Sequence, residues 1–348
     1  MTRTPYFSGN EKPILEVEGL TVDIDVPAGK LHAVSDVDLH VGRGETLCIV
    51  GESGCGKTMT ALGVMGLTPR RATIGARRLV LEGQDLLAMS KAERSALRGD
   101  RMAMIFQDPM TSLNPVYTVG NQMEEIYRHH GKGGHREARE RAEYLLEKVG
   151  ITAAKGRLGQ YPHQLSGGLR QRVMIAMTLM CEPALIIADE PTTALDVTIQ
   201  AQILRLLADL QKEYRMALVL ITHDLGVVAR MADRVIVMYA GQVVETGTAE
   251  EVFTAPMHPY TQGLLDCIPI PGKTLRGAKL GSIPGIVPSL IGDLTGCQFG
   301  NRCSYAFAAC AAAPVALRKH GKGRGCRCLL DTAPASASVH AKPVGAAP

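Results

Sequence analysis

At residues 51–58 the chain reads Gly51-Glu52-Ser53-Gly54-Cys55-Gly56-Lys57-Thr58, and this stretch decides the fold. Its glycines permit backbone conformations that turn several N–H groups toward one anion. Lys57 can place a positive charge on the terminal phosphates of a nucleotide, and the Thr58 hydroxyl is a suitable ligand for Mg²⁺. The sequence therefore predicts a nucleotide-binding loop made of Gly51, Ser53, Gly54, Cys55, Gly56, Lys57 and Thr58.

The segments on either side give this loop the context of a strand followed by a helix. Residues 45–50 are short and mostly apolar and lie between glycines, which predicts a buried strand. Met59 to Leu67, which follow the loop, predict a helix whose N-terminus faces the phosphates. The alternative is a glycine-rich turn that matches the loop by chance. Such a turn would not need a strand before it and a helix after it, so these two segments strengthen the prediction of a nucleotide-binding loop.

Two acidic residues end a second apolar segment, Leu185–Pro191. Carboxylates at the end of a buried strand are costly unless a cation or a substrate uses them. We expect Asp189 to hold Mg²⁺, directly or through water, and Glu190 to polarise the attacking water in phosphoryl transfer.

A third stretch, Leu165-Ser166-Gly167-Gly168-Leu169-Arg170-Gln171, completes a pattern that resembles the ABC class of ATPases. In that class the nucleotide is sandwiched between two domains, and this stretch serves the site of the partner. The resemblance implies nucleotide contacts from Ser166, Gly167 and Gly168, and a place for Asp196 at the seam of the dimer. It also implies that Gln107 senses the γ-phosphate or Mg²⁺ and that His223 contacts the γ-phosphate.

Charge and composition argue against a nucleic-acid-binding protein and against a membrane-spanning one. A net charge of +4 is too weak to indicate nucleic acid as a partner. The first residues lack an apolar signal core, and no uninterrupted apolar run reaches the length of about 18 residues needed to span a membrane. We therefore expect a cytosolic chain that does not itself cross the membrane.

The pattern along the chain predicts an α/β fold. Residues from roughly Ile14 to Thr46 alternate between apolar and polar, as in an antiparallel β subdomain, whereas continuous apolar runs at 184–188 and 217–221 predict a mostly parallel core sheet. A helical subdomain is expected at about residues 108–180, within an ABC nucleotide-binding domain at 14–247. Residues 248–331 are expected to form a small, irregular, cysteine-containing extension, and 332–348 a disordered tail.

The chain more closely resembles the ATP-binding subunits of bacterial oligopeptide and dipeptide ABC importers. The family-specific residues are Phe106–Pro115, His258–Leu265, Ile283–Gly285 and the cysteine-rich end. The resemblance implies two membrane permease subunits, an extracytoplasmic solute-binding protein and a second ATPase subunit, usually non-identical. It places the chain on the cytoplasmic face of the membrane as a peripheral subunit. Peptides are the implied cargo, and close relatives carry nickel, glutathione or oligosaccharides.

The position that usually places an aromatic ring against adenine in this family matches Ile24 here. An aliphatic side chain keeps apolar contact with the base but loses ring stacking, a difference of about 1 kcal/mol. Recognition of the base is therefore expected to rest on a weaker contact than recognition of the phosphates.

Four cysteines near the C-terminus are candidate metal ligands. Cys297, Cys303, Cys310 and Cys328 lack the closely spaced pairs of a zinc ribbon, and four thiolates suit Zn²⁺ or an iron–sulfur cluster equally well. In some related subunits this pattern holds a [4Fe-4S] cluster, which we favour. Cys326 is a spare ligand, and a set of reduced, unligated thiols is the alternative. We expect the cluster to be structural and to leave nucleotide binding by the core intact.

The sequence thus predicts an ATPase that energises import of peptides. The rival class is a soluble ABC ATPase acting on DNA or ribosomes, but those proteins usually carry tandem domains or long insertions, and this chain has neither. A non-translocating scaffold is disfavoured because every catalytic position is filled.

Overall fold

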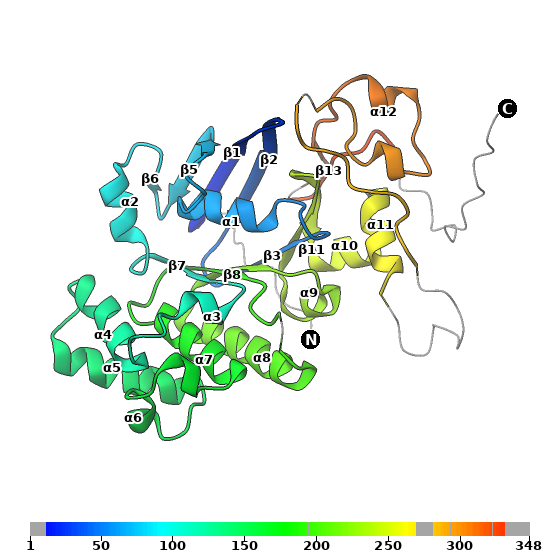
Figure 1. Ribbon diagram of the computed structural model, residues 1–348. Helices are drawn as coiled ribbons and strands as arrows, with labels where there is room; N and C mark the ends of the chain where they lie inside the picture. The colour runs from blue at the N-terminus through cyan, green and yellow to red at the C-terminus, as the bar shows by residue number, and fades with distance from the viewer. Residues whose placement is uncertain (1–11, 194, 269–280, 293, 322, 331–348) are drawn as a thin grey trace.

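The computed structural model describes residues 12–193, 195–268, 281–292, 294–321 and 323–330. Two β-sheets and a group of helices make up most of this part of the chain (Figure 1). The α/β class, the parallel core sheet, the antiparallel subdomain and the helical region that the sequence predicts are all confirmed.

The core sheet has the strand order β12-β13-β11-β10-β3-β9-β8-β7. The five strands from β10 to the edge strand β7 pair in parallel, and the strands at the other end pair antiparallel. The strands are β3 (Thr46–Val50), β7 (Met102–Ile105), β8 (Leu185–Asp189), β9 (Ala217–Ile221), β10 (Arg234–Tyr239), β11 (Gln242–Thr248), β12 (Arg318–Lys319) and β13 (Gly325–Cys326).

The antiparallel sheet packs over the same side of the core sheet as the helix after the phosphate loop, α1 (Lys57–Met65). Its order is β2-β1-β5-β6, with β4 paired to β1. These strands are β1 (Leu15–Val26), β2 (Gly29–Val41), β4 (Ala72–Gly75), β5 (Arg78–Leu81) and β6 (Gln84–Asp85). Alternation of burial along β2 follows from one face packing on the core and the other facing solvent.

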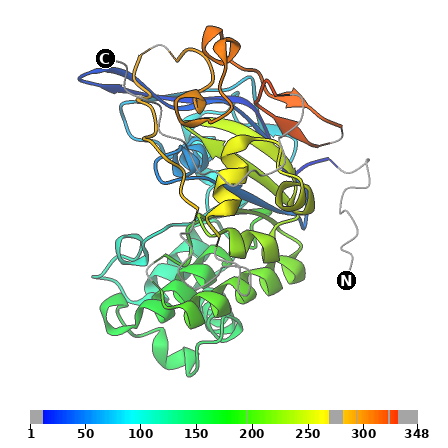
Figure 2. The same cartoon turned by 90° about the vertical axis from the view of Figure 1, so that its right-hand side faces the viewer.

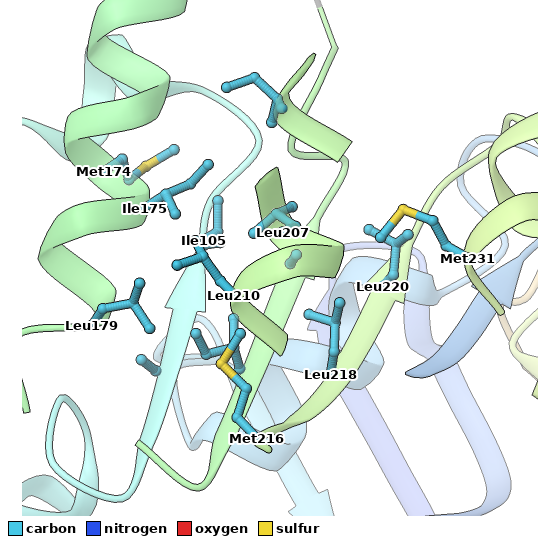
Figure 3. Packing of buried hydrophobic residues seen from close by; sticks show 14 of the residues in the cluster. Ile105, Met174, Ile175, Leu179, Leu207, Leu210, Met216, Leu218, Leu220 and Met231 are labelled. Carbon is cyan, nitrogen blue, oxygen red and sulfur yellow. The ribbon is translucent and has the colours of Figure 1, made fainter. Parts of the chain in front are cut away.

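Strand residues alternate between two hydrophobic clusters, one on each face of the core sheet. Leu47 and Ile49 of β3 face α1 and the antiparallel sheet, whereas Cys48 and Val50 face the helices on the other side. Figure 3 shows the second cluster, where Ile105 of β7 lies beside Ile175 of α7 (Gly167–Thr178), and where Leu218 and Leu220 of β9 belong to the same cluster. Burial on both faces explains why these strands read as continuous apolar runs.

The helical region lies on the opposite side of the core sheet from the antiparallel strands (Figures 1 and 2). Its helices are α3 (Pro109–Ser112), α4 (Val119–His129), α5 (His135–Lys148), α6 (Ala154–Arg157), the 3₁₀ turn Pro162–Gln164, and α7, and α8 (Val197–Tyr214) packs beside them. Apolar residues at helical spacing along α5 and at its C-terminal cap are all fully buried: Ala138, Ala142, Leu145, Leu146 and Val149. Two shorter helices elsewhere are α2 (Lys91–Leu97) and α9 (Leu225–Met231).

The extension after β11 is more ordered than its Pro and Gly content predicts. It contains α10 (Ala249–Thr254), α11 (Pro259–Asp266), a 3₁₀ turn at Gly300–Arg302 and α12 (Ala308–Ala312), and β13 joins the core sheet through β11. Tyr260 is fully buried, and Phe299 and Val315 are nearly so. The order of this segment comes from packing against the main domain, since Tyr260 and Phe299 belong to one of its hydrophobic clusters.

The predicted tail at 332–348 lies outside the described residues, and the predicted domain boundaries remain predictions. Within the described part of the chain, every helix is too short or too polar to cross a lipid bilayer.

Candidate functional site

The candidate site lies where the parallel strands of the core sheet end. In a parallel sheet all carboxyl ends meet at one edge, which is where ligands usually bind. The loop after β3, the acidic pair after β8 and the segment after β9 therefore come together. A cavity of about 610 Å³ opens at this edge, and its lining includes Ser53, Gly54, Gly56, Lys57, Thr58, Gln107, Glu190 and His223.

The phosphate loop has a backbone that only glycine accommodates at two of its positions. Gly51 has φ +153°, and a Cβ atom there would lie 2.2 Å from the Met238 carbonyl oxygen. Gly56 has φ +101°, and its Cβ would lie 2.5 Å from the Ala33 carbonyl oxygen. The loop thus packs against β10 and β2 so closely that side chains at these positions would displace it.

Lys57 is buried within the loop, with 5% of its surface exposed. Its ammonium group donates hydrogen bonds to the carbonyl oxygens of Gly51 and Glu52, each at 2.9 Å. The loop and the buried Lys57 ammonium group together form a compact, positively charged pocket at the N-terminus of α1. Such a pocket is a favourable place for an anion.

Asp189, at the end of β8, accepts a hydrogen bond of 3.1 Å from the Thr58 hydroxyl. Burial raises the pKa of Asp189, and the charge of neighbouring Glu190 raises it further. A carboxylate and a hydroxyl held this close are hard oxygen donors of the kind that Mg²⁺ prefers. The residues present therefore fit a magnesium ion at this point.

Glu190 lies at the centre of a polar group. Its carboxylate accepts a hydrogen bond of 3.2 Å from the Gln107 amide and one of 2.9 Å from the Thr193 hydroxyl, and it lies 3.3 Å from Nδ1 of His223. Its backbone is left-handed, with φ +45°, which is uncommon for a residue with a side chain and often marks a functional position. The structure therefore brings the three predicted catalytic residues together.

Apolar side chains line part of the cavity and form its apolar wall. Ile24, the expected contact for adenine, lines it together with Leu31, Ala33, Met59 and Leu290. Leu290 belongs to the C-terminal extension, and its carbonyl oxygen accepts a hydrogen bond of 2.8 Å from the His32 N–H of β2. No sequence motif marks Leu290, because only the folded chain brings it beside β2.

The remaining predicted nucleotide contacts lie outside this cavity. Ser166 begins α7, and its hydroxyl accepts a hydrogen bond of 3.4 Å from the Leu169 N–H; Gly167 and Gly168 form the first turn. Asp196 begins α8 in the same way: its carboxylate accepts a hydrogen bond of 3.0 Å from the Ile199 N–H. Ser166, Gly167 and Asp196 are exposed, and none of the four lines the cavity with Lys57. The structure therefore leaves them free to serve another chain.

The four cysteines lie around one small cavity in the extension. Cys297, Cys303, Cys310 and Cys328 all line it, beside Phe299. Its volume is about 20 Å³, the room that one water molecule needs. In the part of the chain that the structure describes, no group of three or more His, Cys, Asp or Glu side chains is arranged to hold a metal ion. The donor set suits a metal, but the thiols as placed enclose too little space for a four-iron cluster.

Comparison with known families agrees with this geometry. Residues 34–193 match the family described as ABC transporter. Residues 244–310 match the family described as oligopeptide/dipeptide transporter, C-terminal region. The first match includes Lys57, Gln107, Asp189 and Glu190, and the second covers most of the extension, whereas Ile24, Asp196 and His223 lie outside both.

Two of the similar proteins extend along almost the whole chain. The dipeptide transport ATP-binding protein DppD of Escherichia coli is 50% identical over 315 residues, which cover 90% of this chain and 96% of that protein. The oligopeptide transport ATP-binding protein AppD of Bacillus subtilis is 47% identical over 318 residues, covering 91% of this chain and 96% of that protein.

Among solved structures, the dimeric ATP-binding cassette MJ0796 bound to ADP and Pi is 27% identical. It has a TM-score of 0.61, and the match covers 68% of this chain and 98% of that one. With a nucleotide loop, an acidic strand end and a C-terminal region that all match, the chain belongs to the ATP-binding subunits of oligopeptide and dipeptide ABC transporters.

Proposed function

We propose that this chain hydrolyses ATP to energise the uptake of dipeptides or oligopeptides across the cytoplasmic membrane. The observation that carries the proposal is the convergence of Lys57, Asp189 and Glu190 on one cavity in a chain that also has the oligopeptide/dipeptide C-terminal region. The names of the two relatives support peptides as the cargo.

In this proposal the residues divide the work of phosphoryl transfer. The loop N–H groups and Lys57 bind the β- and γ-phosphates, and Thr58, Asp189 and Gln107 would hold Mg²⁺. The metal ion, when bound, neutralises charge on the phosphates. Glu190 accepts a proton from the attacking water, and His223, on the other side of that carboxylate, orients the γ-phosphate. Gln107 and Thr193 keep the Glu190 carboxylate aimed into the cavity.

A second ATPase subunit completes the site. Ser166, Gly167, Gly168 and Asp196 lie at or near the starts of two helices, all but the half-buried Gly168 are exposed, and they would contact the nucleotide held by the partner. Two observations support this arrangement: these residues lie outside their own cavity, and the similar cassette MJ0796 is dimeric. We propose that the partner is a different ATPase subunit.

A groove of about 740 Å³ lies between the core and the helical region, and its presence supports the proposal of a membrane partner. Phe106 and Tyr117 line it and are substantially exposed, as is Leu67. Phe106 directly precedes Gln107, so an occupant of the groove would sense changes at the cavity. We propose that a short cytoplasmic helix from one of two permease subunits docks here. Through the complex the chain would lie peripherally on the cytoplasmic face and work with an extracytoplasmic solute-binding protein.

A deletion strain tests the proposed function. Cells lacking the gene should lose uptake of a labelled dipeptide or oligopeptide, and the wild-type chain should restore it, whereas Lys57→Ala should not. If uptake of nickel, glutathione or oligosaccharide is lost and peptide uptake is intact, the cargo is that other solute and the proposed mechanism stands. Normal uptake of all four would favour a soluble ABC ATPase acting on nucleic acid or ribosomes.

Ile24→Tyr is expected to tighten ATP binding. The ring would replace an aliphatic contact on the apolar wall with stacking on adenine, which contributes about 1 kcal/mol and so lowers the Kd by about fivefold. The turnover rate at saturating ATP should not change, because the substitution leaves Glu190 and its hydrogen-bond partners unchanged. Nucleotide titration measures the effect, with Ile24→Leu as the control. An unchanged or weaker affinity would mean that adenine lies elsewhere.

We also propose that the four cysteines bind a metal cofactor, with [4Fe-4S] favoured over Zn²⁺; a four-iron cluster would require the thiols to move apart from the positions in which they enclose about 20 Å³. The support is that four thiols from separate parts of the extension line one cavity. Such a cofactor would stabilise the extension, because metal binding to a site absent from the unfolded chain adds to folding stability.

Anaerobic purification followed by elemental analysis checks this cofactor. We expect iron and acid-labile sulfide in equal amounts in the wild-type chain and neither in Cys310→Ser. Cys267→Ser, outside the cavity, is the control and should keep both. Zinc without iron would overturn the choice of cofactor, and absence of any metal would leave four reduced thiols.

A further inference from the structure

The phosphate loop is held by the C-terminal extension at one residue, Glu52. Arg302, in the 3₁₀ turn of the extension, donates two hydrogen bonds to the Glu52 carboxylate, at 2.7 and 3.0 Å. From α11, the Tyr260 hydroxyl accepts a hydrogen bond of 2.8 Å from the Glu52 N–H. Glu52 is thus bound through both its side chain and its backbone by residues more than half the chain away.

Arg302 is built into its place. Only 4% of its side chain is exposed, and its remaining donors bind the carbonyl oxygens of Ile283 and Pro284 and the Tyr239 hydroxyl. The guanidinium also lies over the rings of Tyr239 and Phe299, at 5.7 and 6.0 Å from their centres. Hydrogen bonding to Glu52 raises the pKa of Arg302. A planar group held this fully fixes the position of its partner as well.

Because Glu52 belongs to the phosphate loop, fixing its position also fixes part of the proposed ATP site. Its carbonyl oxygen accepts one of the two loop hydrogen bonds of Lys57. Its carboxylate would also lie unpaired on the phosphate loop if Arg302 were absent, and an unpaired negative charge there would repel a nucleotide. Arg302 therefore has two effects on the loop: it fixes Glu52 in place and it neutralises its charge.

We propose that Arg302 and Tyr260 are positioning residues for ATP, acting through Glu52 on the phosphate loop. The proposal rests on the proposed ATP-binding role of that loop. It revises the expectation that the cysteine cluster, as a structural element of the extension, leaves nucleotide binding by the core intact. Because Arg302 directly precedes Cys303, the segment that lines the cysteine cavity also carries the contact to the loop.

A double-mutant cycle on the full-length chain tests the proposal, with the Kd for MgATP as the measurement. Arg302→Met is expected to raise the Kd about tenfold, within the roughly 5- to 150-fold range of coupling between linked sites. Adding Glu52→Gln to Arg302→Met removes the unpaired charge and should recover binding to within about threefold of wild type. Arg302→Lys should recover it in part, because the charge is kept and the paired geometry is lost. General loosening of the extension would produce neither recovery.

Arg327→Met is the matched control, because Arg327 is also buried in the extension, but among the described residues its guanidinium donates hydrogen bonds to the carbonyl oxygens of Val243 and Val315 and none to the phosphate loop. Its Kd should equal that of wild type. Tyr260→Phe keeps the ring and removes one acceptor, so it provides a second test if Arg302→Met does not fold; we expect a Kd about threefold higher, the size of one modest hydrogen bond.

An unchanged Kd in Arg302→Met, or in Tyr260→Phe if Arg302→Met fails to fold, would overturn the inference, as would an equal rise in Arg327→Met. Failure of the wild-type chain to bind ATP would instead overturn the proposed function, so the two failures are distinguishable.

Discussion

Glu190→Gln is expected to reduce ATP hydrolysis by about a thousandfold while the chain still binds ATP, since a general base contributes roughly 10²- to 10⁴-fold to a rate. Glutamine keeps the size of the side chain and its hydrogen bonds to Gln107 and Thr193, but it cannot accept a proton from water. Lys57, Thr58 and Asp189 are unchanged, so the phosphates remain bound. A closed, ATP-loaded dimer should therefore accumulate.

Steady-state hydrolysis by the purified complex measures this loss, and gel filtration with ATP measures the dimer. Glu213→Gln is the control, because it removes an exposed carboxylate that pairs with Lys148 at 2.7 Å, away from the cavity. It should hydrolyse ATP at the wild-type rate. Hydrolysis by Glu190→Gln at more than about a tenth of the wild-type rate would contradict the role of Glu190, given the size of effect expected for a general base.

Ser166→Arg is expected to abolish hydrolysis at the site of the partner subunit and to spare the site that contains Lys57 of the same chain. The reason is geometric: Ser166 is exposed and lies outside its own cavity, so a large side chain there would block only a neighbouring chain. Lys57→Ala should have the opposite pattern, because Lys57 is inside its own phosphate loop.

Photolabelling with azido-ATP distinguishes the two sites in the complete complex. Ser166→Arg should remove the label from the partner subunit, and Lys57→Ala should remove it from this chain. Ser90→Arg is a matched control, because Ser90 also begins a helix by accepting a backbone N–H, at 3.2 Å from Glu93, but lies in α2. Loss of label from the same subunit in Ser166→Arg and Lys57→Ala would rule out the sandwich.

Much of the core could be predicted because its local and tertiary signals agree. The β3 strand, the loop and α1 have the spacing that the phosphate loop requires, and the apolar positions of α5 are the ones that are buried. The turn between β10 and β11 is another example, since it falls at Ala240-Gly241, where the glycine favours a turn, and both residues have positive φ. In each case one local pattern determines the structure.

The extension could not be predicted to the same degree because its order comes from contacts distant in sequence. The prolines and glycines near α10 and α11 obscure the helical pattern of these segments in the sequence. Their stability comes from packing against the main core, to which Tyr260 of α11 and its neighbour Phe299 belong. In the same way, Leu290 at the nucleotide cavity and Arg302 at the phosphate loop carry no local motif. Their roles depend on which surface the extension covers, and only the folded chain shows that.

Proteoliposomes that contain the complete transporter test the central claim most directly, with ATP inside and the peptide-loaded binding protein outside. ATP hydrolysis and uptake of labelled peptide should rise together when the binding protein is added, and Glu190→Gln should abolish both. Peptide uptake that continues in Glu190→Gln, or ATP hydrolysis that neither drives nor responds to peptide, would contradict the account.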